Sequence, residues 1–150
     1  MRKFSVILMT GAAVLAVTAL AASLTGCGGD SPEGAVNKYL SAWQALDWNA
    51  FESSVAPDNR LSGQDEEEAK IYLEQIPVEF KDIKLSTTLD PEDKNKAKVV
   101  ITGGTVTYKP KIIGKEKTDT KDFSKIAEDA RTYDVVRING VWYVDTELIH

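Results

Sequence analysis

The stretch that decides the fold is Arg137-Ile138-Asn139-Gly140-Val141-Trp142-Tyr143-Val144-Asp145, because it contains the strongest short hairpin signal in the chain. Asn139-Gly140 separates two runs that are rich in β-branched and aromatic residues, and both residues tolerate the backbone angles that a two-residue turn requires. Residues whose numbers add to 279 then face each other, so that Asp134 lies opposite Asp145 at the open end of the hairpin. The sequence therefore predicts a closing antiparallel hairpin with two largely apolar faces.

Two longer strands are predicted upstream of this hairpin. From Val78 to Leu89 apolar residues alternate with polar ones, and a phase slip at Lys81-Asp82 predicts a β-bulge. A second strand over 97–108 is interrupted by Gly103-Gly104, where the missing side chains allow a sheet to bend. Residues 109–130 alternate lysines with acids and are compatible with either a short helix or an edge strand.

Three helices are predicted before the strands. Ser31-Pro32 is a typical helix start, and apolar residues then recur at helical spacing as far as Leu46. Asp47 can cap a second, shorter helix that ends at Pro57-Asp58. The third helix has four acids in its first turn, at 65–68, where the helix dipole favours them. This helix is expected to bury one stripe of apolar residues, namely Ile71, Tyr72, Leu73 and Ile76.

The N-terminal residues have the layout of a secretory signal. Arg2 and Lys3 precede an uncharged run from Phe4 to Leu24. This run matches the roughly 20 residues that span a bilayer, so an uncleaved signal anchor is the alternative, although its many small residues insert weakly. The next residues, Leu24-Thr25-Gly26-Cys27, resemble the lipobox of bacterial lipoproteins, whose cysteine receives a diacylglyceryl group before the signal peptide is removed.

The lipobox resemblance divides the chain into three parts. Residues 1–26 would be a cleaved signal peptide, residues 27–30 a lipidated cysteine with a short tether, and residues 31–150 a single α+β domain. Two acyl chains are sufficient for stable anchoring, so the membrane is an expected partner through the lipid alone. The expected location is the extracytoplasmic face of the bacterial cell membrane. In a host with two membranes, Gly28 after the cysteine is also compatible with a location at the outer membrane.

The charge and the cysteine count exclude several classes of function. Removal of Arg2 and Lys3 with the signal leaves 16 basic residues against 23 acids, a net charge of −7 with His150 neutral. This charge disfavours nucleic acid as a partner. Lipidation of Cys27 would use the only thiol, which excludes disulfides and cysteine nucleophiles from the mature chain.

Three helices followed by a curved sheet that ends at 136–145 resemble the nuclear transport factor two-like fold, which is a cone-shaped (cystatin-like) α+β fold. The ending Arg-Ile-Asn-Gly-Val-Trp-Tyr-Val-Asp is similar to that of small secreted lipoproteins of this superfamily. The resemblance implies three N-terminal helices packed on a curved, mostly antiparallel sheet. Because the superfamily includes isomerases, dehydratases, binding modules and spacer domains, the fold does not select among these activities.

Two sets of residues are candidates for a site inside the cone. Enzymes of the superfamily use an Asp or a His there, but His150 is the last residue of the chain. The opposed pair Asp134 and Asp145 would share a proton or bind a cation if it were buried, whereas strands that splay into water would leave it inert. The second set is aromatic and either lines a pocket or only packs in the core; it consists of Tyr39, Trp43, Tyr72 and Trp142.

No metal or cofactor is predicted, since the acids at 65–68 lack the alternating spacing of a calcium loop. The sequence favours a non-enzymatic module of the cell envelope that binds an unknown small ligand or an envelope protein. The alternative is a small enzyme of the isomerase or dehydratase type that uses a carboxylate in the cone. Asp134 with Tyr133 or Tyr143 is the best set for that chemistry, although neighbouring strand residues point to opposite faces.

The lipobox resemblance generates the first testable prediction. Cys27→Ala removes the sulfur that would carry the diacylglyceryl group, so metabolic labelling with a radioactive fatty acid should be lost completely. The variant should accumulate as a released or uncut precursor in cell fractions. Unchanged labelling of Cys27→Ala would show that the lipobox interpretation is wrong.

Overall fold

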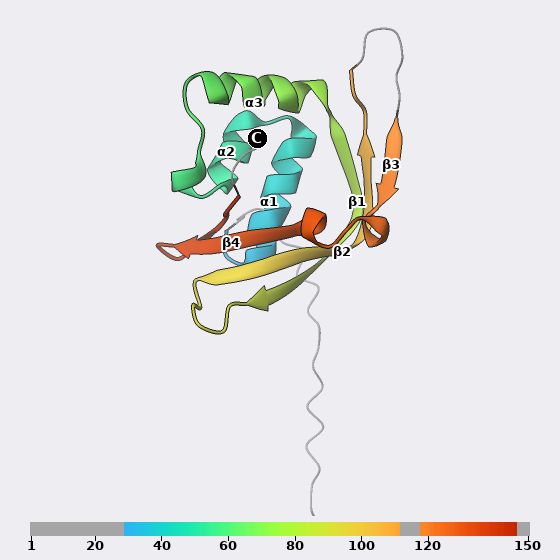
Figure 1. The fold of residues 1–150 in the computed structure, drawn as a ribbon. Helices are drawn as coiled ribbons and strands as arrows, with labels where there is room; N and C mark the ends of the chain where they lie inside the picture. The colour runs from blue at the N-terminus through green and yellow to red at the C-terminus, as the bar shows by residue number, and fades with distance from the viewer. Residues whose placement is uncertain (1–28, 112–117, 147–150) are drawn as a thin grey trace, which may run out of the picture.

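The computed structural model describes residues 29–111 and 118–146 (Figure 1). The expected signal peptide at 1–26, Cys27 and His150 therefore lie outside the described residues. Three α-helices precede the strands, with short 3-10 turns at Pro57–Asn59, Phe123–Lys125 and Asp129–Arg131. The helices are α1 (Pro32–Ala45), α2 (Trp48–Ser54) and α3 (Gln64–Gln75), and the strands are β1 (Val78–Leu89), β2 (Lys96–Tyr108), β3 (Asp119–Asp122), β4 (Thr132–Ile138) and β5 (Val141–Val144).

Side-chain caps start the first two helices where the sequence predicts them. The Ser31 hydroxyl accepts a hydrogen bond of 3.0 Å from the backbone N–H of Gly34 at the start of α1. Asp47 accepts a bond of the same length from Ala50 at the start of α2. Each cap satisfies a backbone donor that the helix itself leaves free. The predicted starts of both helices are confirmed.

Helix α3 forms as predicted, but its expected buried stripe is wrong. Only Leu73 is buried, whereas Ile71 is 53% exposed and Tyr72 is 42% exposed. Consecutive residues of a helix are about 100° apart around its axis, so a helix with one packed side cannot bury three in a row. Helix α3 lies across the C-terminal end of α1 (Figure 1). A hydrogen bond of 3.2 Å links α3 to α2, because Glu66 accepts it from the indole N–H of Trp48.

All the paired strands of the described sheet are antiparallel. The strand order is β1-β2-β4-β5, and β3 also pairs with β2. The closing hairpin has the predicted register, since Ile138 pairs with Val141 and Val135 pairs with Val144. Between 109 and 130, the described residues form the four-residue edge strand β3 and two 3-10 turns. The fold class is thus α+β, with three helices on a curved antiparallel sheet.

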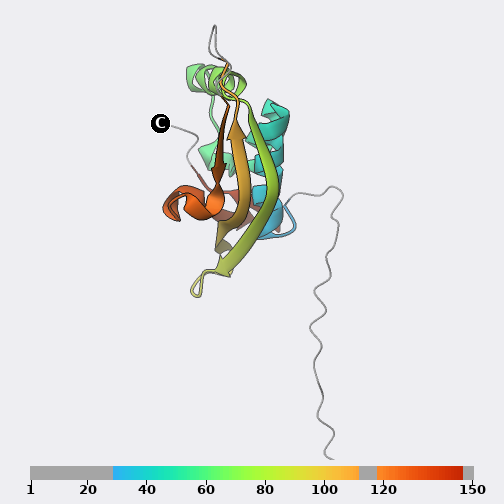
Figure 2. The same cartoon turned by 90° about the vertical axis from the view of Figure 1, so that its right-hand side faces the viewer.

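Strand β2 bends sharply (Figure 1), and the predicted bend residues Gly103-Gly104 lie between its pairings with β4 at 96–100 and with β3 at 105–108. Gly104 has φ +98°, and a Cβ atom there would lie 2.6 Å from the carbonyl oxygen of Lys81. The opposing segment of β1 contains the predicted bulge, because its register with β2 shifts between Lys81 and Leu85. Figure 2 shows β1 and β2 side by side through the bend. Only glycine permits this approach of the two backbones.

The free edge of β5 is covered by two segments from the N-terminal half of the chain. Gly29 accepts a 2.7 Å hydrogen bond from the N–H of Trp142, and Ala56 donates one of 2.9 Å to the carbonyl of Val144. Val55 adds an isolated parallel bridge to Val144. Because an open strand edge invites pairing with other chains, this cover protects the end of the sheet.

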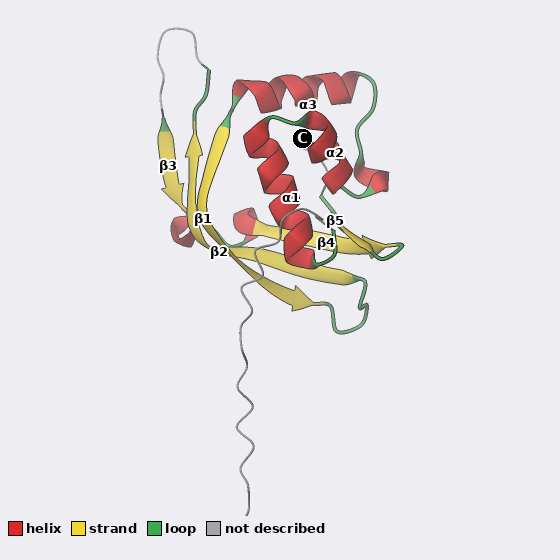
Figure 3. Ribbon diagram, turned by 180° about the vertical axis from the view of Figure 1, so that it is seen from behind, coloured by secondary structure: helices red, strands yellow, loops and turns green. Residues whose placement is uncertain are grey.

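One hydrophobic core joins the helices to the sheet. Helix α1 lies against the sheet with its N-terminal end near β4 and β5 (Figure 3). Trp142 is buried, with 7% exposure, and so packs in the core. The largest fully buried side chains are Phe51, Ile101, Val36, Val55, Val99, Val106, Val135 and Val144. Within 29–111 and 118–146, no helix has the length and apolar character that crossing a bilayer requires.

The bend in β2 generates the second prediction. Gly104→Ala should lower the free energy of unfolding by about 3 kcal/mol, because a side chain at positive φ is strained and its Cβ overlaps the Lys81 carbonyl. Gly103→Ala is the matched control, since its Cβ would meet only the flexible Lys84 side chain at 3.4 Å. The control should stay within about 1 kcal/mol of the wild type. Equal losses in urea unfolding of the two variants would contradict this account of the bend.

Candidate functional site

A cavity of about 320 Å³ lies between the C-terminal end of α1 and the bent part of the sheet. Its walls come from α1, β1, β2, β4 and the segment that contains β3 and the two 3-10 turns that follow it. Five of its eight lining residues are aromatic. The lining residues are Trp43, Phe80, Tyr108, Lys121, Phe123, Ile126, Ala130 and Tyr133.

The bend in β2 brings these residues together from distant parts of the chain. On one edge, β2 pairs with β4 through 96–100 and with β3 through 105–108, on either side of the two glycines. Phe123 follows β3 directly, and Tyr133 is the second residue of β4. Both therefore reach the same concave region, although ten residues separate them in sequence.

The aromatic rings form a continuous wall. The Trp43 and Phe80 ring centroids are 6.0 Å apart at an interplanar angle of 69°, and Phe80 is stacked on Phe123 at 6.4 Å. Behind these residues, the ring centroid of Tyr39 lies 5.7 Å from that of Tyr133 and 6.4 Å from that of Trp43. These edge and offset contacts have the geometry that aromatic pairs prefer. The cavity is thus lined by aromatic rings that already pack against one another.

The tyrosines of this region keep their protons at neutral pH. Burial, with Tyr108 nearby, raises the pKa of Tyr133 to about 12. Burial, with Tyr133 nearby, raises the pKa of Tyr39 well above its usual value. The pKa of Tyr108 is also raised, first by burial and then by Tyr72 and Asp119. The hydroxyls of Tyr108 and Tyr133 are therefore neutral hydrogen-bond donors at the cavity.

The indole N–H of Trp43 is buried and has no hydrogen-bond partner among the described residues. A buried donor that stays unpaired costs about 1–3 kcal/mol. Lys121 supplies a donor at the cavity and is 55% exposed, with its ammonium 5.7 Å from the centre of the Tyr108 ring and 3.8 Å from the Asp119 carboxylate. The eight lining residues include no Asp, Glu or His. The accessible polar side-chain groups of the lining residues are thus an ammonium and two protonated hydroxyls, whereas the Trp43 N–H is buried out of reach of solvent.

The four aromatic residues that the sequence suggests as a pocket do not line one cavity. Tyr39 and Trp142 are buried in the core, and Tyr72 is exposed on α3. Only Trp43 reaches the cavity. Sequence reasoning missed Phe80, Tyr108 and Phe123, and it named Tyr133 only as a partner of Asp134. The strand period offered a signal for the first two, because Phe80 lies two residues after Val78, the partner of Tyr108, and so shares its face.

Asp134 and Asp145 face each other as predicted, but their carboxylates have separate partners. The backbone N–H of Asp145 donates a 2.8 Å hydrogen bond to the carbonyl of Asp134. The Asp134 carboxylate lies 3.0 Å from the Lys98 ammonium, and that of Asp145 accepts a 2.8 Å bond from Asn59. Both residues are exposed and border a surface depression of about 450 Å³. They are therefore arranged as solvated strand-end residues, away from the aromatic cavity.

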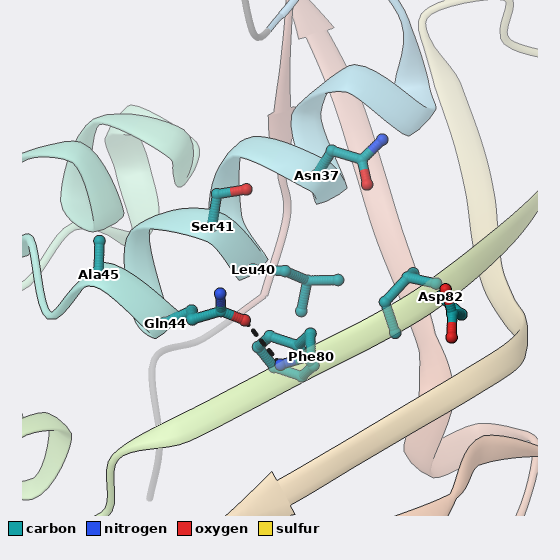
Figure 4. Close-up of a pocket in the computed structure, with 8 residues that line it drawn as sticks. Asn37, Leu40, Ser41, Gln44, Ala45, Phe80 and Asp82 are labelled. Carbon is teal, nitrogen blue, oxygen red and sulfur yellow. Dashed lines mark hydrogen bonds between the residues drawn. The ribbon is translucent and has the colours of Figure 1, made fainter. Parts of the chain in front are cut away.

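A third depression, of about 410 Å³, lies between α1 and the outer edge of β1 (Figure 4). Asn37, Ser41 and Gln44 project into it from one face of α1, opposite Phe80 and Asp82. The Gln44 side-chain oxygen accepts a 2.6 Å hydrogen bond from the N–H of Phe80. Gln44 thereby satisfies an edge donor of β1 at the start of the bulge. In the described ranges, no group of three or more potential metal ligands occurs.

No protein-family model and no curated protein matches this chain. Among solved structures, it is similar to a crystal structure described as that of a putative polyketide cyclase from Silicibacter sp. TM1040. The TM-score is 0.47 at 10% sequence identity, and the match covers 83% of this chain and 99% of that chain. At this level, the similarity carries no argument about activity.

The raised pKa of Tyr133 generates the third prediction. The unfolded chain releases this proton near pH 10 and the folded chain near pH 12, so the free energy of unfolding should fall as the pH rises through this interval. Tyr133→Phe should make that fall shallower in urea unfolding measured at pH 10 and at pH 12. Tyr72→Phe, on the exposed side of α3, is the matched control. A fall of the same steepness in Tyr133→Phe and the wild type would contradict the burial of this hydroxyl.

Proposed function

We propose that this protein is a lipid-anchored extracytoplasmic lipoprotein whose nuclear transport factor two-like domain binds a small ligand without transforming it. The observation that carries the binding role is the cavity of about 320 Å³, because five of its eight lining residues are aromatic and come from distant parts of the chain. An apolar concavity with a few convergent polar groups is the usual form of a small-molecule site.

The side-chain donors of the wall define the class of ligand. Lys121 can only donate, and the protonated Tyr108 and Tyr133 hydroxyls can also donate. Such a lining favours a molecule with oxygen acceptors, and the Lys121 ammonium favours a negative charge on it. The aromatic side chains and the volume of about 320 Å³ favour a small, planar, apolar body. The proposed ligand is therefore an aromatic or unsaturated carboxylic acid, or a close anionic relative.

The alternative is an isomerase or dehydratase, which needs a carboxylate or an imidazole at the reacting atoms. The described cavity wall has neither. Asp134 is adjacent in sequence to the cavity residue Tyr133, but its carboxylate is paired with Lys98 on the exposed side of β4. This separation follows from the alternation of side chains along a strand. It favours binding over proton transfer.

The anchor is the second part of the proposal and rests on the sequence. The lipobox-like residues end at Cys27, two residues before the first described one. A diacylglyceryl group there would hold the domain at the extracytoplasmic face of the membrane. The chain would then present its aromatic cavity to small molecules of the cell envelope.

The fourth prediction tests the cavity with anilinonaphthalene sulfonate, a planar apolar anion that fluoresces when it leaves water. A chain that begins at Gly28 keeps the whole described core and should bind the dye at one site. Trp43→Phe should weaken binding about tenfold, because the smaller ring removes part of the aromatic lining that the dye contacts. Lys121→Met should weaken it about threefold, as expected for a partly exposed charge.

Lys98→Met is the matched control, because this lysine is 66% exposed and pairs with Asp134 away from the cavity. It should leave the dye affinity unchanged, and urea unfolding should confirm that all variants are folded. Equal affinities of wild type and Trp43→Phe would contradict the proposed site. Conversion of a carbonyl substrate by the wild type, with loss of activity in Asp134→Asn, would favour the enzyme instead.

A further inference from the structure

Gly29 is buried at the edge of the sheet, at the very start of the described chain. Its carbonyl accepts a 2.7 Å hydrogen bond from the N–H of Trp142 in β5. Its φ is +120°, and a Cβ atom there would lie 2.8 Å from a methyl carbon of Val141. Both the backbone angle and the close contact require glycine at this position. Gly29 is thus docked on β5.

The residues that follow Gly29 are held as tightly. Ser31 caps α1 through its bond to the N–H of Gly34, and the Ser31 carbonyl accepts a bond from Ala35. The chain is therefore fixed at two points, first on β5 and then at the start of α1, with only Asp30 between them. A flexible tether would have no such contacts. Gly29 and Ser31 are thus both held by hydrogen bonds to the described domain.

Cys27 precedes Gly29 by two residues in sequence. Consecutive Cα atoms are 3.8 Å apart, so the Cα atoms of these two residues are separated by at most about 7.6 Å. A lipid on Cys27 would therefore keep the docked edge of β5 close to the headgroups. Asn139 and Val141 at the β4–β5 turn belong to this end of the molecule, and both are exposed.

The aromatic cavity lies toward the opposite end of α1. From Ser31 to Trp43 the helix advances about 18 Å at 1.5 Å per residue. In Figure 1, α1 runs from the level of β4 to α3, which lies across its C-terminal end. We infer that the docking of Gly29 orients the domain on the membrane, with the β4–β5 turn next to the bilayer surface and the cavity held away from it. The inference rests on the proposed anchor at Cys27.

This orientation also specifies the source of the ligand. A cavity that faced the headgroups would take its ligand from the bilayer, whereas one held away from them takes a molecule dissolved in the aqueous space of the envelope. A planar acid with one charge has the solubility that such a route needs. The domain would thus bind small anions that are dissolved in the aqueous space of the envelope.

The fifth prediction tests the orientation on the full lipidated chain in vesicles of phosphatidylcholine that contain a rhodamine-labelled lipid. The thiol of Cys27 is consumed by lipidation, so one added cysteine gives a unique dye position. Asn139→Cys reports on the β4–β5 turn and Glu74→Cys on the exposed side of α3. Energy transfer to the labelled lipid should be at least about twofold more efficient from position 139 than from position 74, because the distance differs by roughly the length of α1.

Gly29→Val should reduce this difference, because a side chain at position 29 prevents the packing of this residue on β5. Asp30→Ala changes an exposed neighbour and should preserve the difference. Equal transfer from positions 139 and 74 in the otherwise wild-type lipidated protein would overturn the orientation, even if Gly29→Val failed to fold. Absence of lipid on the wild-type chain would overturn the anchor and the orientation together. Neither result would affect dye binding to the unlipidated chain, which tests the cavity separately.

Discussion

The close approach of Gly104 to the bulge in β1 is the constraint on which the rest of the structure depends. A side chain at Gly104 would overlap the Lys81 carbonyl, so only glycine lets β2 turn there. Because β2 bends, one of its edges pairs with two strands, with β4 before the glycines and with β3 after them. The sheet becomes concave, and α1 fills the hollow except at its C-terminal end. The cavity is what remains open.

The chemistry of that opening follows from the residues that the bend brings to it. Five aromatic rings supply apolar area, while an ammonium and two hydroxyls supply donors. This combination favours recognition of a planar anion. The docking of Gly29 on β5 supports the proposed placement of the domain, because Gly29 lies two residues after Cys27 in sequence.

Local chemistry allowed much of this fold to be predicted from the sequence. The caps at Ser31 and Asp47, the bulge after Lys81 and the Asn139-Gly140 turn each depend on a few adjacent residues, and each was confirmed. The buried stripe of α3 was wrong, since the pattern could not show that only one side of this helix is covered. The cavity was largely missed, because its residues come from five separate segments that only the bend in β2 assembles. Residue type alone selected Tyr39, Tyr72 and Trp142, but Tyr39 and Trp142 are buried in the core and Tyr72 is exposed on α3.

The central claim is that the aromatic cavity holds a small anion in the living envelope. Native mass spectrometry of the protein extracted from its own membranes tests this claim most directly. The account predicts a wild-type mass that exceeds that of the lipidated chain by one small acidic molecule, and loss of this additional mass in Trp43→Phe with retention of the lipid. A wild-type protein that carries the lipid and no small molecule, and that binds no planar acid when one is added, would contradict the account.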